Sequence, residues 1–372
     1  MNKIVLAMMA ACSISVVQAQ DSESTSTSWF KQNKVFQNLD VSVSAGTTGI
    51  GIDVASKIGD YVQLRAGYDY MPRYKTELLF PVEIGGQPAV VYDDNGTRIA
   101  TTFDRLSKML KDFTGFQVDE AITMLGHPTV NNFKFLVDVY PFKQNRHWHF
   151  TAGFYWGPSQ FAYAENSTLS MTSLLAVNMY NQMYDKCVKD DPIISIEGDD
   201  SEENPGINIF LPEAYRQKIV NYGRMGFHAG YYKNDVYYTY PEDVYSEPDD
   251  DGEVELLHKA GETVLLHKAG DPYMVEPGAD GMVTARAKAK SFKPYLGFGY
   301  GGRLLKNRDD WQVSFDAGAM FWGGTPDLYT HDGTNLTKDV TDVTGRVGDW
   351  VHFIGGLKFY PVINVRFTKT IF

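Results

Sequence analysis

LKFYPVINVRFTKTIF, the stretch of residues 357–372 that ends the sequence, alternates between apolar and mostly polar side chains. A period of two residues indicates a β-strand whose two faces meet different surroundings. The apolar face carries Leu357, Phe359, Pro361, Ile363, Val365 and Phe367. The polar face carries Lys358, Tyr360, Asn364, Arg366, Thr368 and Thr370. We therefore expect one C-terminal strand, drawn over residues 350–372, that ends on Phe372.

Earlier segments repeat this alternation, and each is close to the ~10 residues that a tilted strand of a membrane barrel needs. They are residues 62–70, 133–140, 148–156, 293–300 and 311–321.

The strand count depends on the segment before residue 60. Apolar residues fall on odd positions at 41–45 and on even positions at 50–54, so the phase changes at 46–49. A turn there gives eight strands, whereas a β-bulge would leave an odd count. We predict eight, with ten as the alternative if residues 225–240 also belong to the wall.

Short and long connections also alternate. The short ones lie at 59–60, 143–146 and 306–309, and the long ones at 73–129, 161–284 and 323–349. Outer-membrane barrels place short turns in the periplasm and long loops outside the cell. Apolar residues at helical spacing predict short helices in these loops, over 103–113, 118–125 and 171–183.

The N-terminus has the features of a secretory signal. A cationic start precedes an apolar stretch over residues 4–17, and Val17-Gln18-Ala19 fits the small-residue pattern before a cleavage site. We predict a signal peptide over 1–19, cleavage between Ala19 and Gln20, a periplasmic tail over 20–38, and the barrel with its loops over 39–372. A lipoprotein signal that ends at Cys12 is the rival interpretation.

The signal, the strand rhythm and the terminal Phe372 resemble the small outer-membrane barrels typified by OmpA and OmpW. The resemblance implies an all-β, antiparallel transmembrane barrel in the outer membrane of a Gram-negative cell, surrounded by outer-membrane lipids. It also implies that Phe367 and Phe372 form the C-terminal signal read by the barrel-assembly machinery. The formal net charge of −12 argues against nucleic acid as a partner.

The polar faces of the strands carry both signs of charge. The candidate lumen charge network is Asp53, Arg65, Asp69, Lys134, Asp138, Arg303, Asp316, Lys358 and Arg366, with His149 and Lys293 on the same faces. An eight-stranded barrel is barely wide enough for its own side chains. These charges therefore form either a salt-bridge plug or a narrow polar path that selects ions or small solutes.

No cofactor or metal site is expected. The acidic runs at 197–203 and 249–253 lack the ligand spacing of a calcium loop, and the repeated Leu-Leu-His-Lys-Ala-Gly at 256–261 and 265–270 is interpreted as similar hairpin tips. Ser159 and Ser167 lie near the outer end of a strand, whereas His147 and His149 lie near the inner end, so no catalytic arrangement is expected.

Three functional hypotheses follow. The first is a structural or surface-binding barrel whose loop 161–284 contacts an extracellular partner, because loops carry binding when a rigid scaffold presents them. Under this first hypothesis, the long loops form either a packed cap or a ligand pocket over the barrel mouth. The alternative is a narrow porin-like channel, and the least favoured is a lipid-modifying enzyme.

Overall fold

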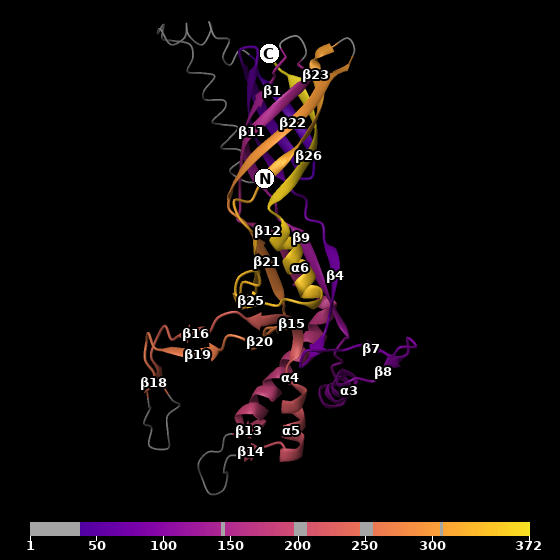
Figure 1. Ribbon diagram of the computed structural model, residues 1–372, viewed down its shortest axis with the longest axis vertical. Coiled ribbons are helices and arrows are strands. Elements are labelled where there is room, and N and C mark those ends of the chain that lie inside the picture. Colours follow the sequence, from indigo (N-terminus) through magenta and orange to yellow (C-terminus); the bar gives the residue numbers. More distant parts are fainter. Residues whose placement is uncertain (1–37, 143–145, 197–206, 246–255, 306–307) are drawn as a thin grey trace.

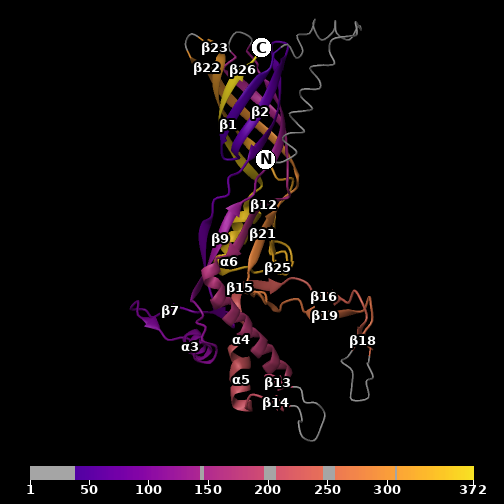
Figure 2. The same cartoon turned by 180° about the vertical axis from the view of Figure 1, so that it is seen from behind.

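The computed structural model describes residues 38–142, 146–196, 207–245, 256–305 and 308–372. The expected signal peptide, its cleavage site and rival Cys12, residues 20–37 of the tail and both acidic runs lie outside the described residues. The described chain forms a barrel, with a second folded part at one end of it, which we call the body (Figures 1 and 2).

The barrel is closed and antiparallel, which confirms the eight-stranded prediction. Its strands follow the order β1-β2-β3-β10-β11-β22-β23-β26, and β1 pairs with β26 to close the wall. Their bounds are β1 Asp40–Gly46, β2 Gly49–Ile58, β3 Val62–Tyr70, β10 Asn132–Val139, β11 Trp148–Trp156, β22 Phe292–Leu305, β23 Arg308–Phe321 and β26 Phe359–Thr370.

The change of phase near residue 47 is a turn. Gly46 pairs with Gly49, and Gly49 has a φ of 95°, a backbone conformation that favours glycine. Val43 therefore pairs with Ile52, and both side chains are exposed on the outside of the wall. The turn explains why the apolar parity differs between the two strands.

The C-terminal strand is shorter than predicted. β26 begins at Phe359, and residues 345–356 form helix α6 (Gly345–Gly356), so the expectation of one strand over 350–372 is wrong. Trp350, Phe353, Ile354 and Leu357 lie at helical spacing, which competes with the weaker alternation there. Pro361 is tolerated because β1 pairs with β26 only from Asn364 onward.

Apolar and aromatic side chains cover the outside of the barrel. Exposed side chains on the wall include Ile52, Phe150, Leu296, Phe298, Phe315, Ile363, Val365 and Phe367. Such a surface is stable only in hydrocarbon, and a closed wall pairs every strand edge, as the membrane interior requires. The protein is an outer-membrane β-barrel. Among the described residues, no helix has the length and apolar character of a membrane span.

The body lies at one end of the barrel, which we call the body end. The opposite end, with the C-terminus and the short connections after β2, β10 and β22, is the turn end (Figure 1). The main sheet of the body has the order β24-β21-β12-β9-β4. Its strands are β24 Asp327–Thr330, β21 Thr284–Lys288, β12 Gln160–Asn166, β9 Ala121–Pro128 and β4 Thr76–Pro81.

This sheet continues the barrel wall. The chain runs directly from β3 to β4, β9 to β10, β11 to β12, β21 to β22 and β23 to β24, so five body strands follow the order of five barrel strands. Backbone hydrogen bonds cross the joint, from Thr129 to Phe161 (2.8 Å) and from Ala289 to Ser159 (2.8 Å). Helix α6 directly precedes β26 in the chain and extends the wall at that position. It contacts both edge strands of the main sheet, β4 and β24.

The rest of the body packs beyond this sheet. A second sheet has the order β20-β15-β5-β6, and its strand β15 spans Met225–Tyr232. The ten-stranded alternative is therefore wrong. The other elements are β5 Glu83–Ile84, β6 Gln87–Pro88, β7 Val91–Tyr92, β8 Arg98–Ile99, η1 Thr168–Ser170, β13 Ile194–Ile196, β14 Ile207–Ile209, β16 Val236–Thr239, β17 Val244–Tyr245, β18 Leu256–His258, β19 Thr263–His267, β20 Pro272–Val275 and β25 Val340–Thr341.

Three further helices lie in the long connections: α3 (Thr102–Thr114), α4 (Met171–Lys189) and α5 (Glu213–Tyr222). α3 and α4 match the expected helices. The helix expected over 118–125 is wrong, because β9 occupies most of it and pairs with β4 and β12. Sheet pairing overrides a helical spacing of apolar residues here. Cys187 is buried in α4 as a free thiol.

The repeated Leu-Leu-His-Lys-Ala-Gly segments contribute to two hairpin-like ladders, β17–β18 and β16–β19. His258 stacks on Tyr240 at 4.1 Å between ring centroids, and His267 stacks on Tyr232 at 4.5 Å. The two histidines thus make the same contact in each copy. Within the part of the chain that the structure describes, no three metal-ligating side chains gather.

Candidate functional site

The middle of the barrel lumen holds a compact network of charges. Arg65 Nη2 lies 2.9 Å from Asp138 Oδ1, and Arg366 Nε lies 3.1 Å from Asp316 Oδ2. His149 Nε2 lies 2.7 Å from Asp316 Oδ1. These residues come from β3, β10, β11, β23 and β26, and all are buried. The network therefore ties together strands from across the barrel.

A second cluster is centred on Lys134. Its ammonium lies 2.9 Å from Asp53 Oδ1 and 2.6 Å from Asp69 Oδ1, and all three side chains are almost fully buried. Seven of the nine predicted network residues thus gather in these two clusters. They are Asp53, Arg65, Asp69, Lys134, Asp138, Asp316 and Arg366.

Two predicted members lie elsewhere. Lys358 precedes β26 and is exposed, and Arg303 is exposed near the turn end of β22. Lys293, in contrast, is buried, and its ammonium donates hydrogen bonds to Asn132 Oδ1 (3.2 Å) and to the carbonyls of Pro158 and Ser291.

Glycines on the inward face make room for the charges. A Cβ added to Gly67 would overlap the Asp53 carboxylate and the Ile52 carbonyl, and one added to Gly299 would overlap the His149 ring. The inward glycines are therefore part of the network's construction, because any side chain there would displace a charged group.

Side chains fill the lumen. Apolar and aromatic groups occupy the space that the charges leave, and they include Leu136, Tyr155, Tyr295, Met320 and Val362, each at most 3% exposed. A polar cavity of about 360 Å³ enters from the turn end and is lined by Arg146, His149, Arg303 and Arg366 among others. It meets the network at His149 and Arg366.

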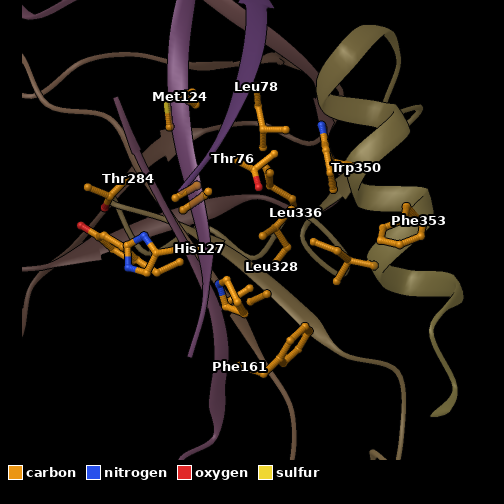
Figure 3. A pocket seen from close by; sticks show the side chains of 18 of the residues that line it. Thr76, Leu78, Met124, His127, Phe161, Thr284, Leu328, Leu336, Trp350 and Phe353 are labelled. Carbon is orange, nitrogen blue, oxygen red and sulfur yellow. The ribbon is translucent and has the colours of Figure 1, made fainter. Parts of the chain in front are cut away.

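A larger and apolar cavity lies in the body, and we call it the chamber (Figure 3). Its volume is about 660 Å³, within the usual range for small-molecule sites. The main sheet supplies one wall through Leu78, Met124 and Leu328, and α6 supplies the opposite wall through Trp350 and Phe353. The chamber thus lies between the continued barrel wall and the helix that joins its edges.

The floor of the chamber is the mouth of the barrel. Trp322, which directly follows β23, stacks on Phe161 at 4.6 Å between ring centroids and meets the edge of Tyr360 at 5.8 Å. Tyr360 donates a hydrogen bond to the carbonyl of Thr47, in the β1–β2 turn. These aromatic rings separate the chamber from the charged lumen.

The chamber lining carries few polar groups. Among the described residues that line it, none is Lys, Arg, Asp or Glu. Two lining nitrogens, His127 Nδ1 and Trp322 Nε1, are buried and have no hydrogen-bond partner. An uncharged lining with a few polar atoms suits a ligand that is itself mostly apolar.

Asp332 holds the segment after β24, which forms part of the chamber wall. Its carboxylate accepts hydrogen bonds from Tyr273 Oη (2.9 Å) and Thr334 N (3.1 Å), besides Thr330 Oγ1. Burial alone would raise the pKa of Asp332, but hydrogen bonds from Thr330, Thr334 and Tyr273 outweigh it and lower the pKa below its ordinary value.

We therefore expect the segment around Asp332 to loosen in acid. The folded-state pKa of Asp332 lies below its value near 4 in the unfolded chain, so ionised Asp332 stabilises the fold at pH values above 4. This stabilisation disappears as the pH falls through the folded-state pKa. Hydrogen exchange of residues 327–336 should accelerate as the pH falls below about 4, after correction for intrinsic rates. In Asp332→Asn the acid-dependent part should vanish, and an unchanged profile would contradict the assignment.

The sequence does not indicate which residues line the chamber. Its lining comes from all three long connections, so no single stretch of sequence contains it. One signal was available for Trp322: the even positions of β23 face inward at Asp316 and Met320, and Trp322 continues that parity.

Comparison with solved structures finds similarity to Acinetobacter baumannii CarO2, at 13% identity and a TM-score of 0.33 over 90% of this chain and 98% of that chain. CarO of the same organism is similar at 13% identity and a TM-score of 0.32, over 91% of this chain and 98% of that chain. No protein-family model and no curated protein matches the chain. The barrel itself is established by its own strand pairing.

Proposed function

We propose that this protein is a surface-binding barrel of the outer membrane that holds an apolar small molecule in the chamber. The observation that carries the proposal is an apolar cavity of about 660 Å³ whose described lining contains no Lys, Arg, Asp or Glu. Filling such a cavity with a ligand removes apolar surface from water on both sides, which is the main driving force for binding.

The proposed orientation follows from the connections. Short turns lie in the periplasm in barrels of this kind, so the turn end faces the periplasm and the body faces the outside of the cell. The chamber is then at the cell surface, and segment 161–284 contributes to it through Phe161, Ala164 and Phe227. In this proposal the partner of that segment is a small molecule.

The proposal includes the biogenesis expected from the sequence. The signal peptide is cleaved between Ala19 and Gln20, and the barrel-assembly machinery inserts the chain through Phe367 and Phe372. Phe367 is exposed on the wall, where lipid surrounds it, and Phe372 is exposed at the end of the chain. No catalytic step is part of the proposal.

A dye-binding experiment tests the proposal. The full mature chain, refolded into phosphatidylcholine nanodiscs, is titrated with the apolar fluorophore aminoanthracene. Ala164→Phe places a ring in the chamber, and Ala260→Phe places the same ring on an exposed turn of the body. We expect Ala164→Phe to weaken binding about tenfold or more, because steric conflict of this kind costs about 1–3 kcal/mol.

Ala260→Phe should bind the dye as the wild type does. Empty nanodiscs give the lipid background, which is subtracted. Equal binding by the wild type and Ala164→Phe would place the dye outside the chamber and would overturn the proposal.

A narrow channel is the second candidate. The polar cavity at the turn end favours it, because Arg146, Arg303 and Arg366 line a water-accessible entrance toward the lumen. Conduction would require the charge network to move, since its side chains are buried and closely paired. Single-channel recording in a planar lipid bilayer separates the two candidates, because only a channel conducts.

A further inference from the structure

We infer that the ligand of the chamber is a neutral amphiphile, an unbranched apolar chain that ends in an uncharged oxygen acceptor, and that Trp322 Nε1 donates a hydrogen bond to that oxygen. The inference rests on the proposed function and adds the chemical class of the ligand and the residue that recognises its head group.

Trp322 presents an unpaired donor to the chamber. Its side chain is 1% exposed, and Nε1 has no hydrogen-bond partner although it can only donate. Buried polar groups are nearly always paired, so an unpaired indole N–H on the lining of a cavity points to an acceptor on the ligand. Phe161 and Tyr360 hold the ring from two sides, which fixes the direction of the N–H.

The described lining of the chamber carries no Lys, Arg, Asp or Glu, which disfavours a charged ligand. A buried carboxylate or phosphate is stable only with a cation or several hydrogen-bond donors around it. Of the described lining residues, His127 alone can become cationic, and none is Lys or Arg. A charged head group would therefore lose its hydration without compensation, whereas an uncharged oxygen acceptor is satisfied by one donor.

The lining of the chamber extends along β4. The lining residues of β4 and the segment before it run from Tyr74, beside the barrel, to Phe80, which meets Phe227 edge-on at 6.3 Å. Six residue steps of extended chain span about 20 Å. The chamber thus has a polar group at its floor, Trp322, and an apolar far end at Phe80. This arrangement fits an amphiphile whose head group lies toward the barrel and whose apolar chain points away from it.

Competition among three ligands of equal chain length tests the inference. Dodecanol, dodecane and dodecanoate, at pH 8, displace aminoanthracene from the full mature chain in nanodiscs. In the wild type we expect dodecanol to bind about fivefold to tenfold more tightly than dodecane, the effect of one hydrogen bond to an otherwise unpaired donor. Dodecanoate should bind more weakly than dodecanol.

The variant Trp322→Phe keeps a ring against Phe161 but removes the N–H. It should abolish the preference for dodecanol over dodecane and leave dodecane binding near the wild-type value. The matched control Trp350→Phe changes a lining tryptophan whose Nε1 is not among the buried unpaired atoms, and it should keep the preference.

The outcomes distinguish the two proposals. If no ligand displaces the dye and Ala164→Phe has no effect, the proposed function fails. If dodecane and dodecanol bind the wild type equally, or dodecanoate binds most tightly, the chamber binds apolar ligands but the inferred class is wrong. This comparison uses the wild type alone, so it holds even if Trp322→Phe does not fold.

Discussion

Replacing Asp316 by Asn should destabilise the barrel by about 3–5 kcal/mol, the usual effect of removing one partner from a buried ion pair. The Asp316 carboxylate meets Arg366 at 3.1 Å, His149 at 2.7 Å and Arg65 at 3.8 Å. Asn keeps the shape of the side chain but removes its charge. Two guanidinium groups then remain in the lumen with Asp138 as their nearest carboxylate.

The measurement is urea unfolding of the refolded full chain in lipid vesicles, followed by tryptophan fluorescence. Glu165→Gln makes the same chemical change in the exposed pair Lys75–Glu165, where the atoms lie 3.4 Å apart, and should cost less than about 1 kcal/mol. The double variant Asp316→Asn with Arg366→Gln should recover part of the loss, because it removes a cation together with its partner. Equal effects of Asp316→Asn and Glu165→Gln would mean that the lumen charges are solvated.

The wild-type barrel should be silent in a planar lipid bilayer, whereas Arg65→Ser combined with Asp138→Ser should give discrete conductance steps. The reason is that buried side chains fill the lumen, and this pair, 2.9 Å apart, lies on the inner face of the neighbouring strands β3 and β10 and contacts Asp316 and Arg366. Removing both partners preserves the balance of charge and opens space for water. The readout is single-channel current at fixed voltage.

Lys75→Ser combined with Glu165→Ser removes an ion pair from the surface of the body and should leave the bilayer silent. Discrete steps from the wild type would mean that the network rearranges, and would favour the channel over the surface-binding barrel. Silence of the lumen variant, with the barrel shown to be folded, would mean that Tyr155, Tyr295 and the other buried groups close the path without the pair.

Much of the barrel could be predicted from the sequence because membrane and lumen impose opposite demands on alternate residues. The parity that puts Ile363 and Val365 in lipid also puts Asn364 and Arg366 inside, and that rule needs no knowledge of distant contacts. The turn at Gly46–Gly49 was predictable for the same reason, since it reverses the parity.

The misplaced residues show where this rule stops. Lys358 was assigned to the lumen because the alternation extends back to Leu357, but α6 ends at Gly356 and the strand begins at Phe359. Arg303 has the inward parity, yet it lies at the turn end, where a long side chain reaches solvent. Parity gives the face of a residue and not its depth in the membrane.

Neither the contacts within the charge network nor the lining of the chamber could be predicted from the sequence, because both depend on residues that are distant along the chain. Arg65 and Asp316 are separated by most of the sequence, and parity alone does not say which carboxylate meets which guanidinium. The chamber lining mixes Leu78, Ala164, Trp322 and Trp350 from three connections. Each connection looked like an independent loop, whereas together they form one continued wall.

Because the wall is continuous, the length of the barrel strands determines the position and register of the body strands that follow them. Only three residues, 129–131, separate β9 from β10, and equally short stretches, 157–159 and 289–291, join β12 and β21 to the barrel. A single inserted residue in one of these links would turn every following side chain to the opposite face. Lengthening the barrel for a thicker membrane therefore requires matched, even-numbered insertions in neighbouring strands if the chamber is to keep its lining.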